Sequence, residues 1–282
     1  MAPVVAIIAP GMMGSAVGKR LVEHGVRVTT VLSGRSAASA ARAREAGMVA
    51  VDESEAIAAD FVMSIVPPAT ALPLAERLLP LLQASRRKPI YIDCNAVSPA
   101  TAAAVGAVIS ATGCPFVDAG IIGAPPRPGY DGTVFYASGE AAPRFAQLGE
   151  HGLKIRVLDG PVGAASAMKM SYAGITKGFT ALAAAMMLAA TREGTAETLH
   201  AELAESQPAL LAWLTRQMPA MYSKAYRWVA EMEEIAAFVA DDPAAQQMFK
   251  AYARFYERVA ADYDGDKCEV GALTAFIKRD QK

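Results

Sequence analysis

The sequence lacks an excess of either charge. Its 27 basic and 28 acidic residues give a formal net charge of −1 over 282 residues. This balance gives no reason to expect nucleic acid or a membrane surface as a partner. No basic segment precedes the first apolar run, so we expect no secretory signal peptide. These absences favour a soluble, cytoplasmic protein.

Cysteine and histidine are both scarce. The cysteines are odd in number and share no CxxC spacing, and we expect buried, reduced thiols at Cys94, Cys114 and Cys268. The histidines are isolated from one another and from acidic clusters, at His24, His151 and His200. The sequence therefore supports neither a metal site nor a histidine-based catalytic triad.

Long hydrophobic runs are absent, although 53% of the residues are hydrophobic. Alanine contributes much of that fraction, which favours closely packed helices. The most apolar stretch, residues 179–191, is too short and too rich in alanine to span a bilayer. A chain of this length can form one large domain or two, with an ample core.

The chain begins with the pattern of a dinucleotide-binding βαβ unit. An apolar run at residues 4–8 breaks into a turn at residues 9–14 (Ala-Pro-Gly-Met-Met-Gly), and a helical pattern follows. Gly11 would let the backbone approach a pyrophosphate, and Gly14 would let the helix pack closely on the strand. Ala9 stands where the first glycine of the fingerprint is expected, so the motif is incomplete.

Strand and helix signals then alternate through the first half of the chain. Strands are expected at residues 27–32, 60–66, 89–93, 116–119, 133–138 and 154–158. Helices are expected at residues 13–24, 36–46 and 70–83, with a further helix opening at Ser98-Pro99. Pro80 argues against the last turn of the helix at 70–83. The alternation predicts an α/β fold with a mostly parallel, doubly wound, Rossmann-like sheet.

The character of the sequence changes after Gly163. Residues 165–192 hold no proline and no strand pattern, which predicts one helix of roughly 40 Å that ends near Gly194. From Thr195 onward the sequence is helical in pattern. We therefore expect a dinucleotide-binding domain in residues 1–163, an interdomain helix in 164–194 and an all-α substrate and dimerisation domain in 195–282.

The segment after the second strand predicts the choice of cofactor. An NAD site usually places an acidic side chain there to bind the ribose 2′-hydroxyl, but this chain has Ser33-Gly34-Arg35-Ser36. Arg35 could bind a 2′-phosphate through two hydrogen bonds, with both serines as further donors. The alternative is a solvated arginine in a turn. We expect NADP, with NAD left open.

Lys169 lies within the first two turns of the predicted long helix. A lysine on a helix is normally a surface charge. The neighbours of this one are small or apolar: Met168, Met170, Tyr172, Ala173 and Gly174. A partly desolvated lysine could exchange a proton near neutral pH.

The order of these motifs resembles the β-hydroxyacid dehydrogenase and 6-phosphogluconate dehydrogenase superfamily over almost the whole chain. The turn at residues 9–14 resembles the family's Gly-x-Gly-x-x-Gly start. Four later segments resemble, in order, its cofactor-side loop, the segment after its fifth strand, its substrate-binding segment and its catalytic-lysine motif: residues 64–67, 93–99, 118–124 and 163–173. Lys169 takes the position of the catalytic lysine.

Apart from Ala9, the departures from the family pattern lie in the substrate-binding segment and the lysine motif. Ile122 replaces a serine that holds the substrate carboxylate, and Ala165 replaces the second glycine of the lysine motif. Ala173 replaces the asparagine that assists the lysine. Arg127 could supply the lost anion contact, or it is a loop charge. The imine reductases are similar in architecture and also depart at these positions, although they commonly lack the lysine.

The resemblance implies a set of site residues and a homodimer whose helical domain closes over the substrate. The cofactor-binding residues are expected to be Gly11, Met12, Met13, Gly14, Ser33, Arg35, Ser36, Val66, Pro67 and Asn95. The substrate-binding residues are expected to be Ile122, Gly123, Ala124, Tyr172, Trp228 and Met232, although a pair such as Trp228 and Met232 is usually core.

We therefore expect an NADP-dependent oxidoreductase that transfers a hydride between the nicotinamide and a small hydroxy or carbonyl compound. Lys169 would be its general acid or base. One alternative is an imine reductase. Another is a cofactor-binding sensor or scaffold without turnover, since the helper asparagine is absent.

Overall fold

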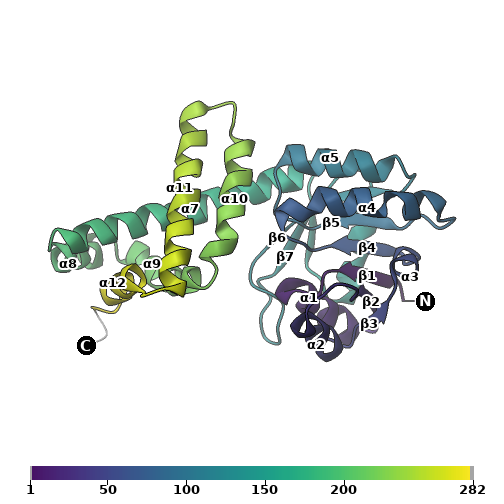
Figure 1. The fold of residues 1–282 in the computed structure, drawn as a ribbon, viewed down its shortest axis with the longest axis horizontal. Helices are drawn as coiled ribbons and strands as arrows, with labels where there is room; N and C mark the ends of the chain where they lie inside the picture. The colour runs from purple at the N-terminus through teal and green to yellow at the C-terminus, as the bar shows by residue number, and fades with distance from the viewer. Residues whose placement is uncertain (1, 280–282) are drawn as a thin grey trace. The chain divides into compact units, whose positions relative to one another are not determined.

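The structure is a computed structural model that describes residues 2–279 (Figure 1). Contacts divide the chain into two compact units, which we call unit 1, up to Met170, and unit 2, from Ser171 onward. The division falls inside helix α7 (Ala164–Arg192). Each unit is described by itself below.

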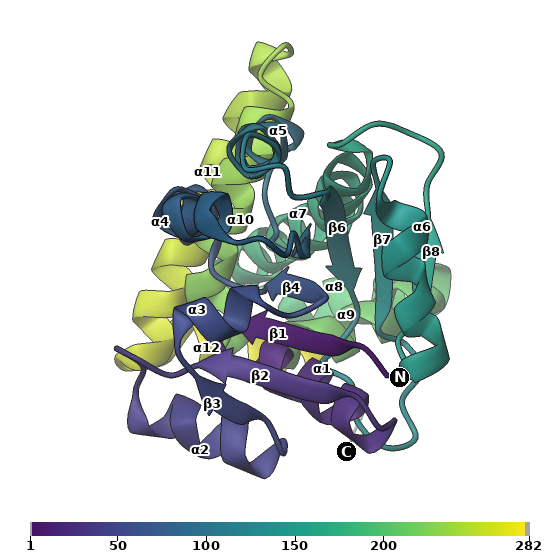
Figure 2. The same ribbon diagram turned by 90° about the vertical axis from the view of Figure 1, so that its right-hand side faces the viewer.

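Unit 1 contains an eight-stranded sheet with the order β3-β2-β1-β4-β5-β6-β7-β8 (Figure 2). Neighbouring strands are parallel except for β6 and β7, which are antiparallel. The predicted, mostly parallel, doubly wound sheet is confirmed. Its strands are β1 (Val4–Ile8), β2 (Arg27–Val31), β3 (Val49–Val51), β4 (Phe61–Ser64), β5 (Ile90–Asp93), β6 (Phe116–Ile122), β7 (Val134–Ser138) and β8 (Ile155–Val157).

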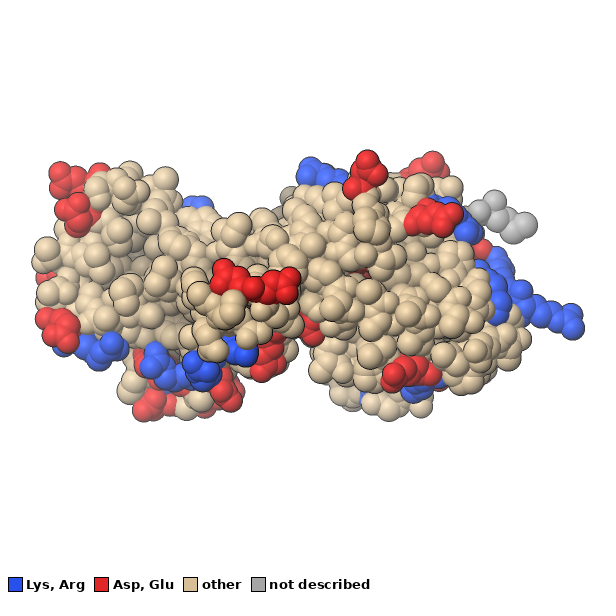
Figure 3. Space-filling model, turned by 90° about the horizontal axis from the view of Figure 1, so that it is seen from above, with Lys and Arg blue, Asp and Glu red and all other residues tan. Residues whose placement is uncertain are grey.

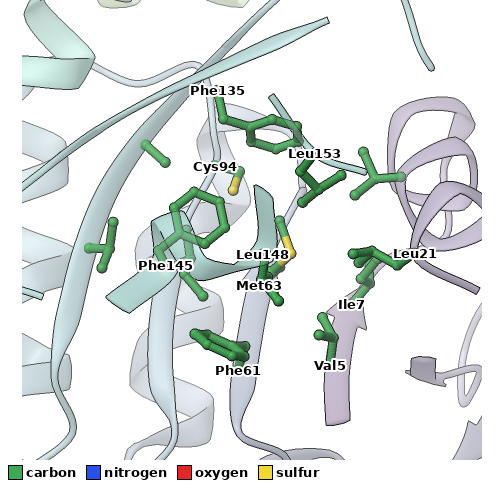
Figure 4. Close-up of a cluster of buried hydrophobic side chains, with 14 of the residues drawn as sticks. Val5, Ile7, Leu21, Phe61, Met63, Cys94, Phe135, Phe145, Leu148 and Leu153 are labelled. Carbon is green, nitrogen blue, oxygen red and sulfur yellow. The ribbon is translucent and has the colours of Figure 1, made fainter. Parts of the chain in front are cut away.

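Helices cover both faces of this sheet and enclose two apolar cores. The helices are α1 (Met12–Glu23), α2 (Ala37–Glu45), α3 (Glu53–Ile57), α4 (Ala71–Ala84), α5 (Pro99–Ser110) and α6 (Ala142–Phe145), with 3₁₀ turns η1 (Pro68–Thr70) and η2 (Ala146–His151). One core joins α1, α2 and α6 to the sheet and includes Ile7, Leu21 and Phe145 (Figure 4). The other joins α3, α4 and α5 to the opposite face. The two cores therefore hold the strands of the sheet, and the loops that follow them, in fixed positions.

Unit 2 is helical, as predicted. Its described residues form the rest of α7 and five further helices: α8 (Ala196–Ser206), α9 (Pro208–Tyr222), α10 (Ala225–Phe238), α11 (Pro243–Asp264) and α12 (Cys268–Ile277). By length and composition α7 is apolar enough to cross a membrane, but core helices of soluble proteins pass the same test. In the face drawn in Figure 3, each unit carries both basic and acidic side chains amid a largely uncharged surface.

Three local predictions differ from the structure. Strand β3 and helix α3 were not predicted, because elements of three and five residues are too short to show a period. Helix α4 continues through Pro80, which argued against the last turn of the predicted helix. Leu78 and Leu82 flank this proline and are fully buried, so tertiary packing outweighs the lost hydrogen bond.

The prediction of buried thiols is right for two cysteines and wrong for the third. Cys94 and Cys114 are buried, whereas Cys268 is exposed. Cys268 begins α12, and the buried face of that helix is formed instead by Val270, Leu273, Phe276 and Ile277. Within residues 2–279, no three His, Cys, Asp or Glu side chains are grouped so that they could hold a metal ion.

A row of polar residues crosses four neighbouring strands of unit 1. Ser64, Asp93, Asp118 and Ser138 are paired in register on β4, β5, β6 and β7. All four are buried. Because in-register residues of adjacent strands point to the same face, the two carboxylates are brought close together inside the protein.

Burial raises the pKa of Asp93 from its ordinary 3.8 to about 7, and the nearby Asp118 adds to the rise. Asn95 opposes the rise, since its backbone and side-chain N–H groups donate to Oδ1 of Asp93. The other oxygen, Oδ2, is buried and finds no hydrogen-bond partner among the described residues. An unpartnered buried oxygen penalises the charged form of this side chain.

This shift predicts a pH dependence of stability. Between pH 3.8 and about 7 the folded state retains the Asp93 proton that the unfolded chain loses. The free energy of unfolding should therefore fall as pH rises through this window, by on the order of 3 kcal/mol. Asp93→Asn removes the titration. The stability advantage of this variant, which is its free energy of unfolding minus that of the parent protein, should therefore grow from pH 4 to pH 8.

Denaturant unfolding at several pH values measures that advantage. The exposed Asp131 provides a matched control, since Asp131→Asn should show a nearly constant difference from the parent. An advantage of Asp93→Asn that does not change with pH would mean that Asp93 is ionised throughout the range.

Candidate active site

The predicted cofactor residues gather at one edge of the sheet. Ile8, Ser64, Asp93 and Asp118 are in register, so β1, β4 and β5 end at the same level and β6 extends beyond it. The residues after these ends are the predicted ones: the turn at 9–14, residues 66–67 and Asn95. Loop 33–36 follows β2, which is paired with β1. This edge is where open α/β sheets bind ligands.

The turn after β1 fits a dinucleotide phosphate. A Cβ at Gly14 would lie 2.4 Å from the carbonyl oxygen of Ala9, whereas a Cβ at Gly11 would meet nothing within 4 Å among the described residues. Helix α1 begins after Gly11 with no side-chain cap and no acidic residue in its first turn. Its first N–H groups and its positive dipole end are thus available to an anion.

Ala9 adopts the left-handed conformation, with φ 71°. Glycine adopts this conformation without strain, and this explains why the family's fingerprint begins with glycine. The alanine keeps the turn's geometry at a local cost of about 1 kcal/mol. The other residues of the turn differ in exposure, since Met12 is 55% exposed and Met13 packs on the core.

Loop 33–36 presents polar groups to solvent at the end of β2. Ser33 and Arg35 are exposed, and Gly34 turns the chain with φ 70°. The side chain of Ser36 accepts a hydrogen bond from the backbone N–H of Ser39 at 3.3 Å and so caps α2. Ser36 therefore has a structural role in addition to the predicted one.

The side chain of Asn95 joins two strand ends. Its side chain accepts a hydrogen bond from the N–H of Val66 at 2.7 Å and donates to Oγ of Ser64 at 2.9 Å and to Asp93. Asn95 is buried, while Pro67 is exposed. Asn95 therefore positions the loop that carries Val66 and Pro67.

The carboxylate of Asp118 anchors the start of α7. Its Oδ2 accepts hydrogen bonds from the backbone N–H groups of Gly163 (2.9 Å) and Ser166 (3.0 Å) and from Oγ of Ser138 (3.1 Å). Its Oδ1 accepts from Oγ of Ser166 at 2.6 Å. Ser138 in turn accepts from the N–H of Ala165 at 3.0 Å. A carboxylate at a helix N-terminus also stabilises the helix dipole.

Lys169 lies one helical turn beyond this anchor, against β6. A Cβ at Gly120 would lie 2.8 Å from Cβ of Lys169 and 3.2 Å from the carbonyl oxygen of Ala165. Gly120 therefore allows α7 to contact the strand directly. Gly120 is two residues past Asp118, so the half-buried lysine lies at the same edge as the predicted cofactor residues.

The predicted substrate segment runs from the end of β6 into a tight turn. Gly123 has φ 113°, and a Cβ there would lie 2.2 Å from the carbonyl oxygen of Gly132. Ala124 donates its N–H to Oη of Tyr130 (3.1 Å) and accepts at its carbonyl from Oγ1 of Thr133 (2.6 Å). Both Gly123 and Ala124 are exposed, and Ile122 is half-buried.

Arg127 lies on the same loop as an exposed charge. Its guanidinium stacks on the ring of Tyr130, 5.4 Å from the centroid. Its carbonyl accepts a hydrogen bond from Arg20 at 3.2 Å. The loop is therefore packed by its own residues, with Tyr130 in contact with both Arg127 and Ala124.

The predicted substrate residues of unit 2 differ in exposure. Tyr172 is 46% exposed, whereas Met232 is fully buried. Trp228 packs edge-on against Tyr256 with centroids 5.1 Å apart, and Nζ of Lys177 lies 4.9 Å from its ring centre. Lys177 also forms an ion pair with Glu231. In unit 2, Trp228 and Met232 thus stabilise the packing of the helices.

The structure adds residues that the sequence did not single out. Ser138 and Ser166 complete the hydrogen bonds of Asp118, and Gly120 makes room for the lysine. The sequence signal for Gly120 was its position two residues after the aspartate of the substrate motif. Ser138 offered no signal, because its role depends on the antiparallel register of β6 and β7.

Comparison with known families agrees with this arrangement. The NAD binding domain of 6-phosphogluconate dehydrogenase matches residues 4–148, which is more than half of the chain. A domain of unknown function, DUF1932, matches residues 190–259. The second match lies wholly within unit 2 and carries no activity with it.

Solved structures extend the likeness over the whole chain. A conserved protein of unknown function, described as similar to 3-hydroxyacid dehydrogenases, is 30% identical with a TM-score of 0.70, and the match covers 94% of this chain and 99% of that one. The 3-hydroxyisobutyrate dehydrogenase of Mycobacterium tuberculosis, with L-serine, is 21% identical with a TM-score of 0.67, over 98% of this chain and 99% of that one.

A third structure is a reductive aminase of Aspergillus terreus in complex with NADPH and ethyl levulinate. It is 18% identical with a TM-score of 0.58, over 98% of this chain and 100% of that one. At their low identities, the last two structures show a shared fold. The matched NAD-binding domain, which covers more than half of the chain, and the 30%-identical structure identify the chain as a member of the β-hydroxyacid dehydrogenase and 6-phosphogluconate dehydrogenase superfamily of NAD(P)-dependent oxidoreductases.

Proposed function

We propose that the protein is an NADP-dependent oxidoreductase that acts on a small hydroxy or carbonyl compound, with Lys169 as its general acid or base. The observation that carries this proposal is the contact of Lys169 with Gly120 at the strand edge. This contact holds the lysine of the family motif at the edge of the sheet that also carries the glycine turn at residues 9–14. The cofactor would supply or accept the hydride.

The proposed cofactor site uses residues of unit 1 alone. Gly11 and the first N–H groups of α1, with Met12, Met13 and Gly14, would hold the pyrophosphate. Ser33, Arg35 and Ser36 would hold the 2′-phosphate, since no acidic side chain occupies loop 33–36. Val66 and Pro67, positioned by Asn95, would line the cofactor on its other side.

Lys169 would handle the proton that accompanies the hydride. In oxidation its amine takes the proton of the substrate hydroxyl. In reduction its ammonium donates to the forming alkoxide or amine. The lysine is held by Asp118 through the start of α7, and Tyr172, exposed on the next turn, would form part of the substrate site with Ile122, Gly123 and Ala124.

Imine reduction is the second candidate reaction. Ile122 presents an apolar side chain where the family has a serine for the substrate carboxylate, and this favours a substrate without that group. The likeness to a reductive aminase supports the same view. A screen of ketones, aldehydes, hydroxyacids and imines, followed by NADPH absorbance in both directions, would decide between the reactions. Absence of turnover with every class would favour a cofactor-binding sensor.

The first prediction from this proposal concerns cofactor preference. NADP(H) should bind more tightly than NAD(H), because Arg35 can form charge-assisted hydrogen bonds with the 2′-phosphate. Arg35→Ala should weaken NADP(H) binding by at most about 3 kcal/mol and leave NAD(H) binding nearly unchanged. Calorimetric titration of both cofactors against both proteins measures this. Equal affinity for the two cofactors in the parent protein contradicts the assignment.

The second prediction separates chemistry from binding. Lys169→Met preserves side-chain length and helix propensity but removes the ionisable amine. Loss of a general acid or base should lower turnover of the best substrate by about 10²- to 10⁴-fold. NADPH affinity should stay within about threefold, since no phosphate contact is removed.

A near-normal rate of Lys169→Met would make Lys169 a structural lysine, with Tyr172 or Lys177 as the next candidates. Lys154→Met provides a control for the loss of one charge, because Lys154 is exposed and lies before β8. A parallel fall in turnover and NADPH binding would indicate damage to the fold and not a proton-transfer role.

We also propose a soluble, cytoplasmic homodimer. Four large apolar side chains of α7 are strongly exposed: Tyr172 (46%), Ile175 (74%), Leu182 (47%) and Met186 (54%). Their spacing places them on one stripe of the helix. A stripe of this kind favours burial against another protein surface. A partner copy would account for it without a membrane.

Light scattering at dilute concentration and without detergent tests the dimer. The expected mass is twice the chain's 29.5 kDa. Ile175→Glu should shift the protein toward the monomer, because it places a charge at the most exposed of the four positions. A stable monomeric mass for the parent protein would exclude the proposal.

A further inference from the structure

Arg42 of α2 connects the two loops of the proposed cofactor site. Its Nε donates a hydrogen bond to the carbonyl oxygen of Pro10 at 3.3 Å. Its Nη2 donates to Oγ of Ser39 at 2.9 Å. Pro10 belongs to the turn after β1, whereas Oγ of Ser39 lies 3.1 Å from Oγ of Ser36 in the loop after β2. The half-buried guanidinium therefore stands between the two loops.

The guanidinium retains hydrogen-bonding capacity in this position. A guanidinium has five N–H donors. Two of them are used in the contacts with Pro10 and Ser39 among the described residues. A helical side chain points back toward the helix N-terminus, and Arg42 accordingly bonds Ser39, one turn earlier. Among the described residues, three N–H donors of Arg42 are therefore left for a further acceptor.

The electrostatics of this corner favour an anion. Helix α2 begins after Ser36 with no acidic residue in its first turn. No Asp or Glu occurs between Val26 and Arg44, whereas Arg35 and Arg42 both lie there. The positive dipole end of α2 adds to these two charges. A dianionic group at this corner would meet two arginines and two serine hydroxyls.

We infer that Arg42 determines cofactor specificity by providing a second guanidinium for the 2′-phosphate, beside Arg35. This inference rests on the proposed preference for NADP. It assigns a role to a residue in the middle of α2, seven positions beyond Arg35. Ser39 is the positioning residue that holds the guanidinium toward the loop.

A purely structural role for Arg42 makes a different prediction. The bond to Pro10 supports the turn at residues 9–14, which would hold the pyrophosphate. NADP⁺ and NAD⁺ share that pyrophosphate and differ in the 2′-phosphate alone. Loss of a structural support would therefore weaken both cofactors equally, whereas loss of a 2′-phosphate contact weakens NADP⁺ selectively.

Calorimetric titration of NADP⁺ and NAD⁺ against the parent protein and three variants tests the inference. The variants are Arg42→Gln, Arg42→Lys and, as a control for charge, Arg44→Gln on the exposed side of the same helix. Arg42→Gln should weaken NADP⁺ about tenfold or more and NAD⁺ by less than about threefold. Arg42→Lys should recover part of the NADP⁺ affinity, since it retains the charge and loses the fork. Arg44→Gln should change neither.

The outcomes are distinguishable. Equal weakening of both cofactors by Arg42→Gln, or an equal loss with Arg44→Gln, overturns the specificity role. Should Arg42→Gln fail to fold, Arg42→Lys decides: an unchanged NADP⁺ to NAD⁺ ratio overturns the role, and a lowered ratio supports it. A parent protein without preference for NADP⁺ refutes the cofactor proposal itself, and the role of Arg42 falls with it.

Discussion

The carboxylate of Asp118 is the interaction on which the site depends. It satisfies two backbone N–H groups at the start of a 29-residue helix and two serine hydroxyls, all in the interior of unit 1. Buried N–H groups at a helix end are costly when unpaired. The same bonds fix where α7 leaves the sheet. The position of Lys169, one turn later, is a consequence of that anchor and of the room that Gly120 provides.

The two buried carboxyl groups at this edge have different surroundings. Asp118 accepts four hydrogen bonds, whereas among the described residues Asp93 receives donors only from Asn95, and burial raises its pKa to about 7. A protonated Asp93 leaves the edge less negative. That matters at the place where a pyrophosphate is proposed to approach, because uncompensated negative charge would repel it. The polar row thus holds the loops together, and the raised pKa of Asp93 limits the negative charge at the edge proposed for the cofactor.

Patterns that repeat along the chain were predictable, and contacts across it were not. The sheet, the glycine turn and α7 follow from periodicity and from Gly11 and Gly14, and they agree with the structure. The path of α4 through Pro80 depends on Leu78 and Leu82 meeting a core that the sequence does not display. The role of Ser138 requires strand register, and that of Arg42 requires the fold to bring Pro10 beside α2.

The departures from the family pattern divide the site into two halves. On the cofactor side, Ala9 adopts the conformation of the glycine it replaces, so the turn is preserved at the cost of strain. On the substrate side, Ile122 and Ala173 replace polar groups without any such equivalence. A fold can retain its cofactor site while its substrate changes, because the two halves are carried by different loops. Lys169 is retained among these changes, so the chain keeps the residue proposed to transfer the proton while residues proposed to contact the substrate depart from the family pattern.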